Sequence, residues 1–106
     1  MRYVVAAALL LATPAMAQVP AGVPTGDGVA GARIAQTWCA NCHVVTDSPA
    51  RAGDSVPSFP AIAARVSTTM MSLHVFLQTP HAQMPNFQLS RQEIDDVSTY
   101  LLGLRK

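Results

Sequence analysis

Hydrophobic residues recur at helical spacing in two long segments of the chain. From Asp27, whose side chain suits an N-cap, positions three and four residues apart form one apolar face, made of Gly31, Ile34, Ala35 and Trp38. Near the other end, Ser90 and Glu93 form a capping box that opens a final helix. We expect its inner face to hold Ile94, Val97, Tyr100, Leu101 and Leu104, and its polar face to hold Asp95, Asp96, Ser98 and Thr99.

The middle of the chain predicts two more helices. Residues 60–66 form a short candidate with Pro60 in its first turn. Ser67 is a candidate N-cap for a helix that runs to Gln78 and stops before Pro80, with Met70, Leu73, Phe76 and Leu77 on its inner face. Residues 44–60 and 79–89 have the composition of loops. Because no segment alternates like a strand, the predicted fold class is all-α, with three to five helices and long loops.

The first 17 residues have the layout of a secretory signal peptide. Arg2 supplies a positive charge, residues 3–12 are apolar, and Ala15-Met16-Ala17 is a small-x-small cleavage site. The apolar run is far shorter than the roughly 20 residues that a spanning helix needs, which disfavours an uncleaved anchor. We therefore expect cleavage after Ala17, a periplasmic location, a flexible leader over residues 18–26, one domain over residues 27–106 and no membrane span after cleavage.

The remaining domain is small and nearly neutral. Removing 17 residues from 106 leaves 89, a size at which a domain usually needs a covalent or prosthetic staple. Six of the seven basic residues remain beside six acidic ones, and Lys106 is the only lysine. Since there is no basic stripe, we expect no nucleic acid partner, and long-range electrostatic steering of any partner should be weak.

One motif carries recognisable chemistry. Cys39-Ala40-Asn41-Cys42-His43 is a C-x-x-C-H sequence, the attachment signature of c-type haem. Two thiols separated by two residues on a helical turn can each bond one vinyl group of a porphyrin, and the next residue then directs its imidazole at the iron. Cys39 and Cys42 are therefore the candidate attachment points of one haem c, and His43 is the candidate axial ligand.

Three other interpretations of the cysteines remain open at this point. Trp38 precedes them as in a thiol-disulfide oxidoreductase, but such a site needs a strand before the first cysteine, whereas residues 29–37 have helical periodicity. A zinc site would require a second pair of ligands at suitable spacing, drawn from the histidines. A local disulfide between Cys39 and Cys42 would close only a short loop.

The motif and its surroundings resemble the small bacterial class I cytochromes c over nearly all of the mature sequence. That family places a glycine eight residues before the first cysteine, where the first helix touches an aromatic residue of the last; Gly31 and Tyr100 match this pair. The segment Met84-Pro85-Asn86-Phe87 resembles the loop that presents the sixth iron ligand. The resemblance implies a cytochrome c fold wrapped around one covalently bound haem.

The resemblance also implies a haem environment. Val56-Pro57-Ser58-Phe59 resembles the loop whose proline carbonyl accepts a hydrogen bond from the proximal imidazole, so Pro57 is the expected acceptor and Pro60 the second choice. Phe59 and Leu73 are expected to touch the porphyrin.

For the sixth iron ligand we expect Met84. It lies in a loop that can reach over a flat cofactor, whereas Met70 and Met71 belong to a helical run, where methionine more often fills a core. His81, three residues before Met84, is the alternative, and His74 is expected to face solvent.

With both axial positions filled, the iron has no open site, and the resemblance implies an electron carrier rather than an enzyme. We expect a monomer that docks transiently with redox partners, a dehydrogenase as donor and an oxidase or reductase as acceptor. One alternative is a haem subunit bound firmly to a dehydrogenase through an apolar patch, for which Val44, Val45 and the Met84 loop are the candidates. Another is an enzyme or gas sensor in which Met84 is labile.

Overall fold

Four α-helices and one π-helical turn form the regular structure of the described residues. The computed structural model describes residues 25–47, 56–79 and 83–106. Their elements, in order, are α1 (Gly28–Ile34), η1 (Ala35–Cys39), α2 (Phe59–Ala63), α3 (Met70–Gln78) and α4 (Arg91–Gly103). Within these ranges there is no strand, so the predicted all-α class is confirmed. The predicted signal peptide, the leader up to residue 24, Pro80 and His81 lie outside the described residues.

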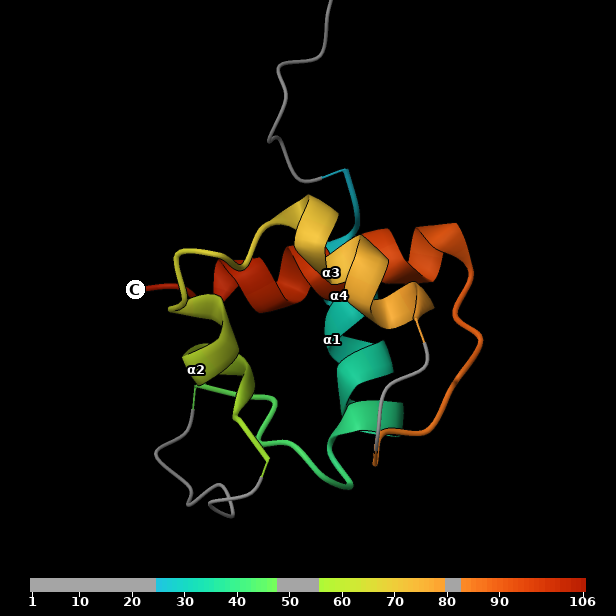
Figure 1. Cartoon of the computed structure of the whole chain (residues 1–106), viewed down its shortest axis with the longest axis horizontal. Coiled ribbons are helices and arrows are strands. Elements are labelled where there is room, and N and C mark those ends of the chain that lie inside the picture. The colour runs from blue at the N-terminus through green and yellow to red at the C-terminus, as the bar shows by residue number, and fades with distance from the viewer. Residues whose placement is uncertain (1–24, 48–55, 80–82) are drawn as a thin grey trace, which may run out of the picture.

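The carboxyl-terminal helix organises the others. Helix α4 contacts α1, α2 and α3, and in Figure 1 it runs behind α3 and across the top of α1. The buried core gathers around it, with Val97 and Leu101 packed among Ala35, Phe59, Ala63 and Leu73. In the segments that the structure describes, no helix is long and apolar enough to cross a membrane.

The first helix begins as its N-cap predicts. The Asp27 carboxylate accepts hydrogen bonds from the backbone N–H groups of Val29 and Ala30, at 2.8 and 3.2 Å. After Ile34 the helix widens into η1, where the Ala40 N–H donates to the carbonyl of Ala35, five residues back, at 2.9 Å. Of the residues expected to share one inner face, Gly31 faces α4 and Ala35 is buried, whereas Trp38 is 49 % exposed.

The two middle helices begin at other residues than predicted. Helix α2 starts at Phe59 because the Ser58 hydroxyl caps it, accepting from Ala61 N–H at 3.2 Å, which places Pro60 in its first turn. Helix α3 starts after Thr69 rather than Ser67. Thr69 and Ser72 form a reciprocal capping box, with bonds of 3.1 and 2.8 Å, and this pairing is better placed than a lone Ser67 hydroxyl.

Helix α4 confirms the predicted capping box but not the predicted polar face. Ser90 and Glu93 cap it reciprocally. Asp96 and Ser98, however, are 7 % and 1 % exposed, because α4 packs against neighbours on more than one side. The Asp96 carboxylate accepts from the backbone N–H of Asp27 at 2.7 Å, which ties the start of α1 to α4.

The contact between α1 and α4 is a close approach of two backbones. A Cβ atom on Gly31 would overlap the Asp96 carbonyl and would lie 2.9 Å from Tyr100 Cβ. The expected pairing of Gly31 with Tyr100 is therefore confirmed. Tyr100 also donates from its hydroxyl to the Val45 carbonyl at 2.7 Å, which fastens the segment after η1 to α4.

Two further polar contacts hold α2 and α3 against α4. His74 was expected to face solvent, but its Nε2 lies 2.6 Å from the Asp95 carboxylate, and both side chains are mostly buried. The Arg105 guanidinium donates to the carbonyls of Ala63 and Thr68, at 2.8 and 2.6 Å. The end of the chain is thus bonded to the end of α2 and to the turn before α3.

We expect Gly31→Ala to lower the free energy of unfolding by about 1–3 kcal/mol, the usual cost of overpacking a core. The added methyl group meets backbone, so only a shift of a whole helix can relieve the clash. Urea unfolding followed by far-UV circular dichroism measures the change. The control is Gly28→Ala on the same helix, whose Cβ would lie 3.8 Å from Thr99 Cγ2 and should be neutral or slightly stabilising. Equal losses in both variants would contradict the close crossing.

Glu93 makes part of the stability depend on pH. Its carboxylate accepts from the Ser90 backbone N–H at 2.7 Å, and this bond, followed by one with the Ser90 hydroxyl, lowers the pKa of Glu93 from its ordinary value. A carboxyl group whose pKa is lower in the folded state stabilises that state fully above its unfolded pKa and loses the contribution as the pH falls. We therefore expect the stability difference between wild type and Glu93→Gln to be largest near neutral pH and to shrink in acid. A difference that stays constant from neutral pH to pH about 3 would refute this.

Candidate functional site

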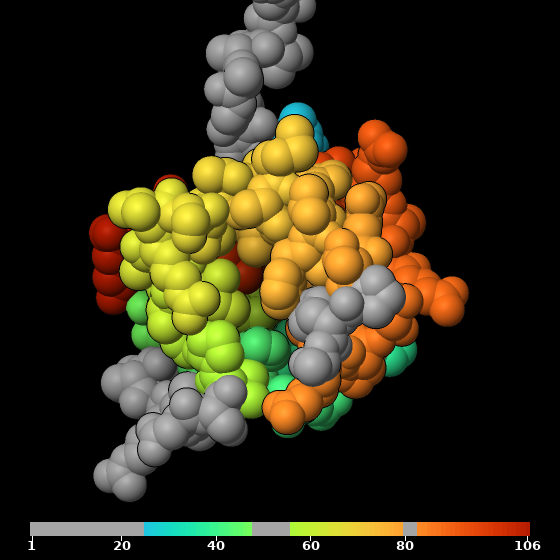
Figure 2. Space-filling view, viewed as in Figure 1, coloured from blue at the N-terminus to red at the C-terminus, as the bar shows by residue number. Residues whose placement is uncertain are grey.

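An apolar pocket lies among α1, η1, α2, α3, α4 and the loop that precedes α4. Its open space, part of it continuous with solvent, measures about 630 Å³. Figure 2 shows a hollow between the surfaces of α2 and α3, with atoms of α4 visible at its floor. Five of the residues predicted to form the site line the pocket: Cys39, His43, Phe59, Leu73 and Met84. None of the lining residues is Asp, Glu, Lys or Arg, so the pocket suits a large apolar group.

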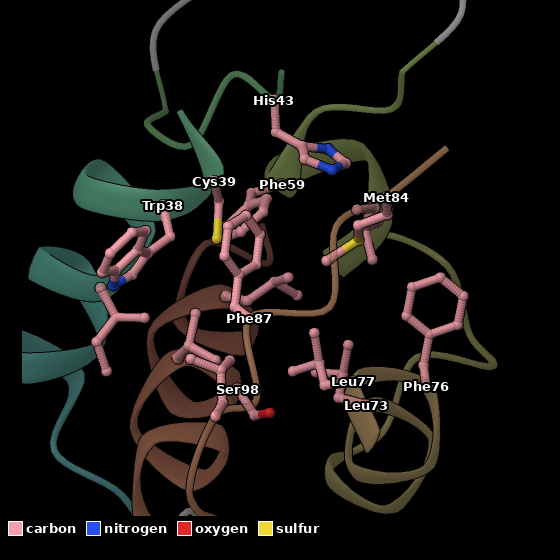
Figure 3. A pocket seen from close by; sticks show the side chains of 15 residues that line it. Trp38, Cys39, His43, Phe59, Leu73, Phe76, Leu77, Met84, Phe87 and Ser98 are labelled. Carbon is pink, nitrogen blue, oxygen red and sulfur yellow. The ribbon is translucent and has the colours of Figure 1, made fainter. Parts of the chain in front are cut away.

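The C-x-x-C-H motif forms a single turn at the end of the first helix. The Cys39 carbonyl accepts from the N–H groups of Cys42 and His43, at 3.1 and 2.9 Å. This is the helical turn that the motif predicted. It presents Cys39 and His43 to the same pocket, as Figure 3 shows, while Cys42 is exposed.

The two cysteines do not have the properties of a redox-active dithiol. No disulfide joins Cys39 to Cys42. Burial raises the pKa of the Cys39 thiol, whereas the attacking cysteine of a thiol-disulfide oxidoreductase needs a lowered pKa. The element before Cys39 is helical, so the strand that such a site requires is absent from the described part of the chain. Cys39, which lines the pocket, is better placed to bond a group inside it.

His43 has a fixed orientation. Its Nδ1 lies 2.6 Å from the carbonyl oxygen of Pro57, which can only accept, so Nδ1 carries the proton and donates. In the neutral imidazole, Nε2 then keeps its lone pair, and this is the form of histidine that binds a metal ion. The Pro60 carbonyl, the second candidate acceptor, instead accepts from Ala64 N–H inside α2.

Pro57 is held in place through the backbone of Phe59, two residues after it. The Phe59 N–H donates to the Val44 carbonyl at 2.9 Å, so the segment before α2 is bonded to the residue after His43. The rings of His43 and Phe59 lie 5.7 Å apart between centroids, which packs the imidazole against the pocket wall. Both anchors restrict the direction in which the imidazole can point.

Met84 reaches the pocket from the loop between α3 and α4. Gln83 before it has a φ of 69°, a left-handed conformation that turns the chain. The two other candidate methionines stay outside: neither Met70 nor Met71 lines the pocket, and Met71 is 74 % exposed. In Figure 3 the Met84 sulfur lies in the upper half of the pocket, as Cys39 and His43 do.

Several residues of the pocket were not predicted as site residues. The rings of Trp38 and Phe87 lie 5.7 Å apart between centroids, and both line the pocket together with Phe76. Ser98 also lines it, although it had been assigned to the polar face of its helix. Its spacing of three residues from Leu101 and four from Ile94 was the available signal, since such residues share a helix face.

One residue of the expected apolar patch, which was Val44, Val45 and the Met84 loop, is buried. Val45 is 5 % exposed and belongs to the core, so it cannot contribute to a docking patch. The exposed large apolar side chains near the pocket are instead Trp38 and Phe76, about half of whose surface is accessible.

The side chains present fit a covalently bound haem. The pocket is apolar and open on one side, as a flat hydrophobic group with an exposed edge requires. Cys39 and His43 line it from one helical turn, and Met84 lines it from a separate loop. Among the described residues, no cluster of three or more His, Cys, Asp or Glu side chains could hold a metal ion by itself.

Comparison with known proteins agrees with this chemistry. The family model for cytochrome c matches residues 28–105. A curated relative, cytochrome c-552 of Bradyrhizobium diazoefficiens, is 41 % identical over 91 residues, which cover 86 % of this chain and 88 % of the relative. No solved structure gave a significant match.

The apolar pocket, the C-x-x-C-H turn and the two comparisons lead to one assignment. The cofactor is a covalently bound haem c, and the protein is an electron carrier rather than an enzyme. The chain therefore belongs to the cytochrome c family.

Proposed function

We propose that the protein is an exported one-electron carrier in which His43 and Met84 are the two axial ligands of the haem iron, attached through Cys39 and Cys42. The observation that carries the proposal is the hydrogen bond from His43 Nδ1 to the Pro57 carbonyl, which leaves Nε2 free to ligate at the wall of an apolar pocket that Met84 also lines. The bound haem supplies an iron that alternates between ferric and ferrous states.

Each residue has a separate task in this proposal. Cys39 and Cys42 form thioether bonds to the haem. These bonds keep the haem in a domain that is too small to retain it by burial alone. Pro57 fixes the direction of the imidazole and increases its basicity through the hydrogen bond. Phe59 and Leu73, which are 5 % and 7 % exposed, cover the ring and exclude water.

The choice of Met84 favours electron transfer over catalysis. A thioether opposite an imidazole occupies the second axial position and raises the reduction potential. With both positions filled, no substrate or dioxygen can bind without displacing a ligand. An enzyme or gas sensor would need Met84 to leave the iron readily.

We further propose that residues 1–17 are removed on export and that the carrier works in the periplasm as a monomer. Its donor is a dehydrogenase and its acceptor an oxidase or reductase, each docking transiently. Burial of Val45 removes one member of the apolar patch that was expected for the alternative, a firmly bound dehydrogenase subunit.

We expect Met84→Ala to retain covalent haem but to lose the red ferric absorption band of the iron–sulfur bond and to lower the reduction potential, because only the axial thioether is removed. Absorption spectra and a spectroelectrochemical titration measure both effects. Met71→Ala is the matched control: it removes an exposed methionine from α3, outside the pocket, and should change neither. An unchanged band and potential in Met84→Ala would rule out Met84 as the ligand.

Mass spectrometry tests attachment and export together. After expression in a host that matures c-type cytochromes, the denatured protein should begin at Gln18 and carry the added mass of one haem. The double variant Cys39→Ser with Cys42→Ser should lose that mass and most of its helical circular dichroism, since the pocket would lack its filling. A wild-type protein without the added mass would overturn the proposed attachment, and one with residues 1–17 intact would overturn the proposed cleavage.

A further inference from the structure

The Ser98 hydroxyl is buried in the pocket without a hydrogen-bond partner. Ser98 is 1 % exposed, and within the described residues its Oγ is the only buried side-chain nitrogen or oxygen left unpaired. Figure 3 shows it at the lower end of the pocket, with its oxygen on the side of Leu73 and Leu77. Buried polar groups are nearly always paired, so this exception requires an explanation.

The other buried polar side chains show the usual behaviour. Thr68 donates from its hydroxyl to the Ile62 carbonyl at 2.7 Å. Asp96 accepts from Asp27 N–H and from the Gln92 amide, at 2.7 and 2.8 Å. Ser98 differs from them in one further respect, because it lines the pocket. A group held in the pocket can therefore interact with the unpaired hydroxyl oxygen of Ser98.

The surroundings of Ser98 make its dipole effective. Leu73, Leu77, Val97 and Leu101 also line this pocket, and no lining residue is Asp, Glu, Lys or Arg. In such a low-dielectric environment a dipole acts more strongly on a nearby charge than it does in water. Because no protein acceptor holds the hydroxyl, it can rotate to present either its oxygen or its hydrogen.

We propose that Ser98 tunes the reduction potential by turning its oxygen toward the positive charge of the ferric iron. This inference rests on the proposed function, in which reduction by one electron removes one positive charge from the pocket. The hydroxyl oxygen stabilises the more positive ferric state over the ferrous state and so lowers the potential. Ser98 does not ligate the iron, and its effect on it is electrostatic.

A different role would have the opposite sign. If the hydroxyl instead donated to a carboxylate of the haem, it would offset that negative charge, and removing it would favour the ferric state. A purely steric role, in which a small residue lets α3 approach α4, would depend on the size of the side chain and not on its oxygen. The direction of the potential shift and an isosteric pair of variants separate these roles.

The experiment measures midpoint potentials of the haem-loaded protein by spectroelectrochemical titration. Ser98→Ala should raise the midpoint potential, so that the ferric-to-ferrous ratio at a fixed applied potential falls about threefold. Since a tenfold change corresponds to about 59 mV for one electron, this is a shift of about 28 mV. Thr99→Ala is the control, because it also removes a hydroxyl from α4. The Thr99 hydroxyl accepts from Gly26 N–H, and Thr99 does not line the pocket. Its potential should equal that of the wild type.

Ser98→Thr and Ser98→Val complete the test. Threonine and valine have nearly the same shape, since each carries two heavy atoms on Cβ. Threonine keeps the hydroxyl oxygen, whereas valine has a methyl group in its place. The threonine variant should therefore have a lower potential than the valine variant, a comparison that decides the question even if Ser98→Ala folds poorly. Equal potentials in this pair, or a potential lowered by Ser98→Ala, would overturn the inference.

The spectra of the same samples show which proposal fails. A wild-type protein without covalent haem, or a Met84→Ala variant with an unchanged ligand band, would refute the proposed function. If haem and the Met84 band are present in all Ser98 variants and the potentials still do not differ, only the role of Ser98 is refuted.

Discussion

The backbone contact of α1 with α4 at Gly31 determines where the parts of the site lie. Because no side chain separates the helices there, the end of the first helix is carried to the wall that α4 forms. That end holds Cys39 and His43, and the wall holds Val97, Ser98 and Leu101. The bond between Asp27 N–H and Asp96 secures the start of α1, and the Tyr100 hydroxyl secures the segment after His43. The pocket thus depends on one helix crossing with polar ties at both ends.

Within that frame, few polar groups face the pocket, and His43 is the one whose orientation a hydrogen bond restricts. The Pro57 carbonyl decides which nitrogen of His43 carries the proton, and the Val44 carbonyl holds the segment that contains Pro57. Met84 comes from a loop whose course is set by left-handed residues at Gln83 and Gln88. The Ser98 hydroxyl has no hydrogen-bond partner in the part of the chain that the structure describes. An otherwise apolar lining makes these few groups the main local influences on the charge of a bound iron.

The contacts that hold the outer elements are also polar and lie away from the pocket. His74 with Asp95 joins α3 to α4, and Arg105 joins the chain end to α2 and to the turn before α3. None of these three side chains lines the pocket, whose exposed aromatic residues are Trp38 and Phe76.

The sequence by itself determined the elements that depend on local chemistry. Asp27 and the Ser90–Glu93 box cap helices through neighbours within three residues, and the C-x-x-C-H turn closes on its own backbone, so these features were predictable. The sequence also identified Met84, Phe59 and Leu73 as site candidates, and all three line the pocket. Only the tertiary structure decided what Asp96, Ser98 and His74 do. Each is polar and was expected to face solvent, yet α4 packs on several sides, and which polar groups it buries depends on residues distant in sequence.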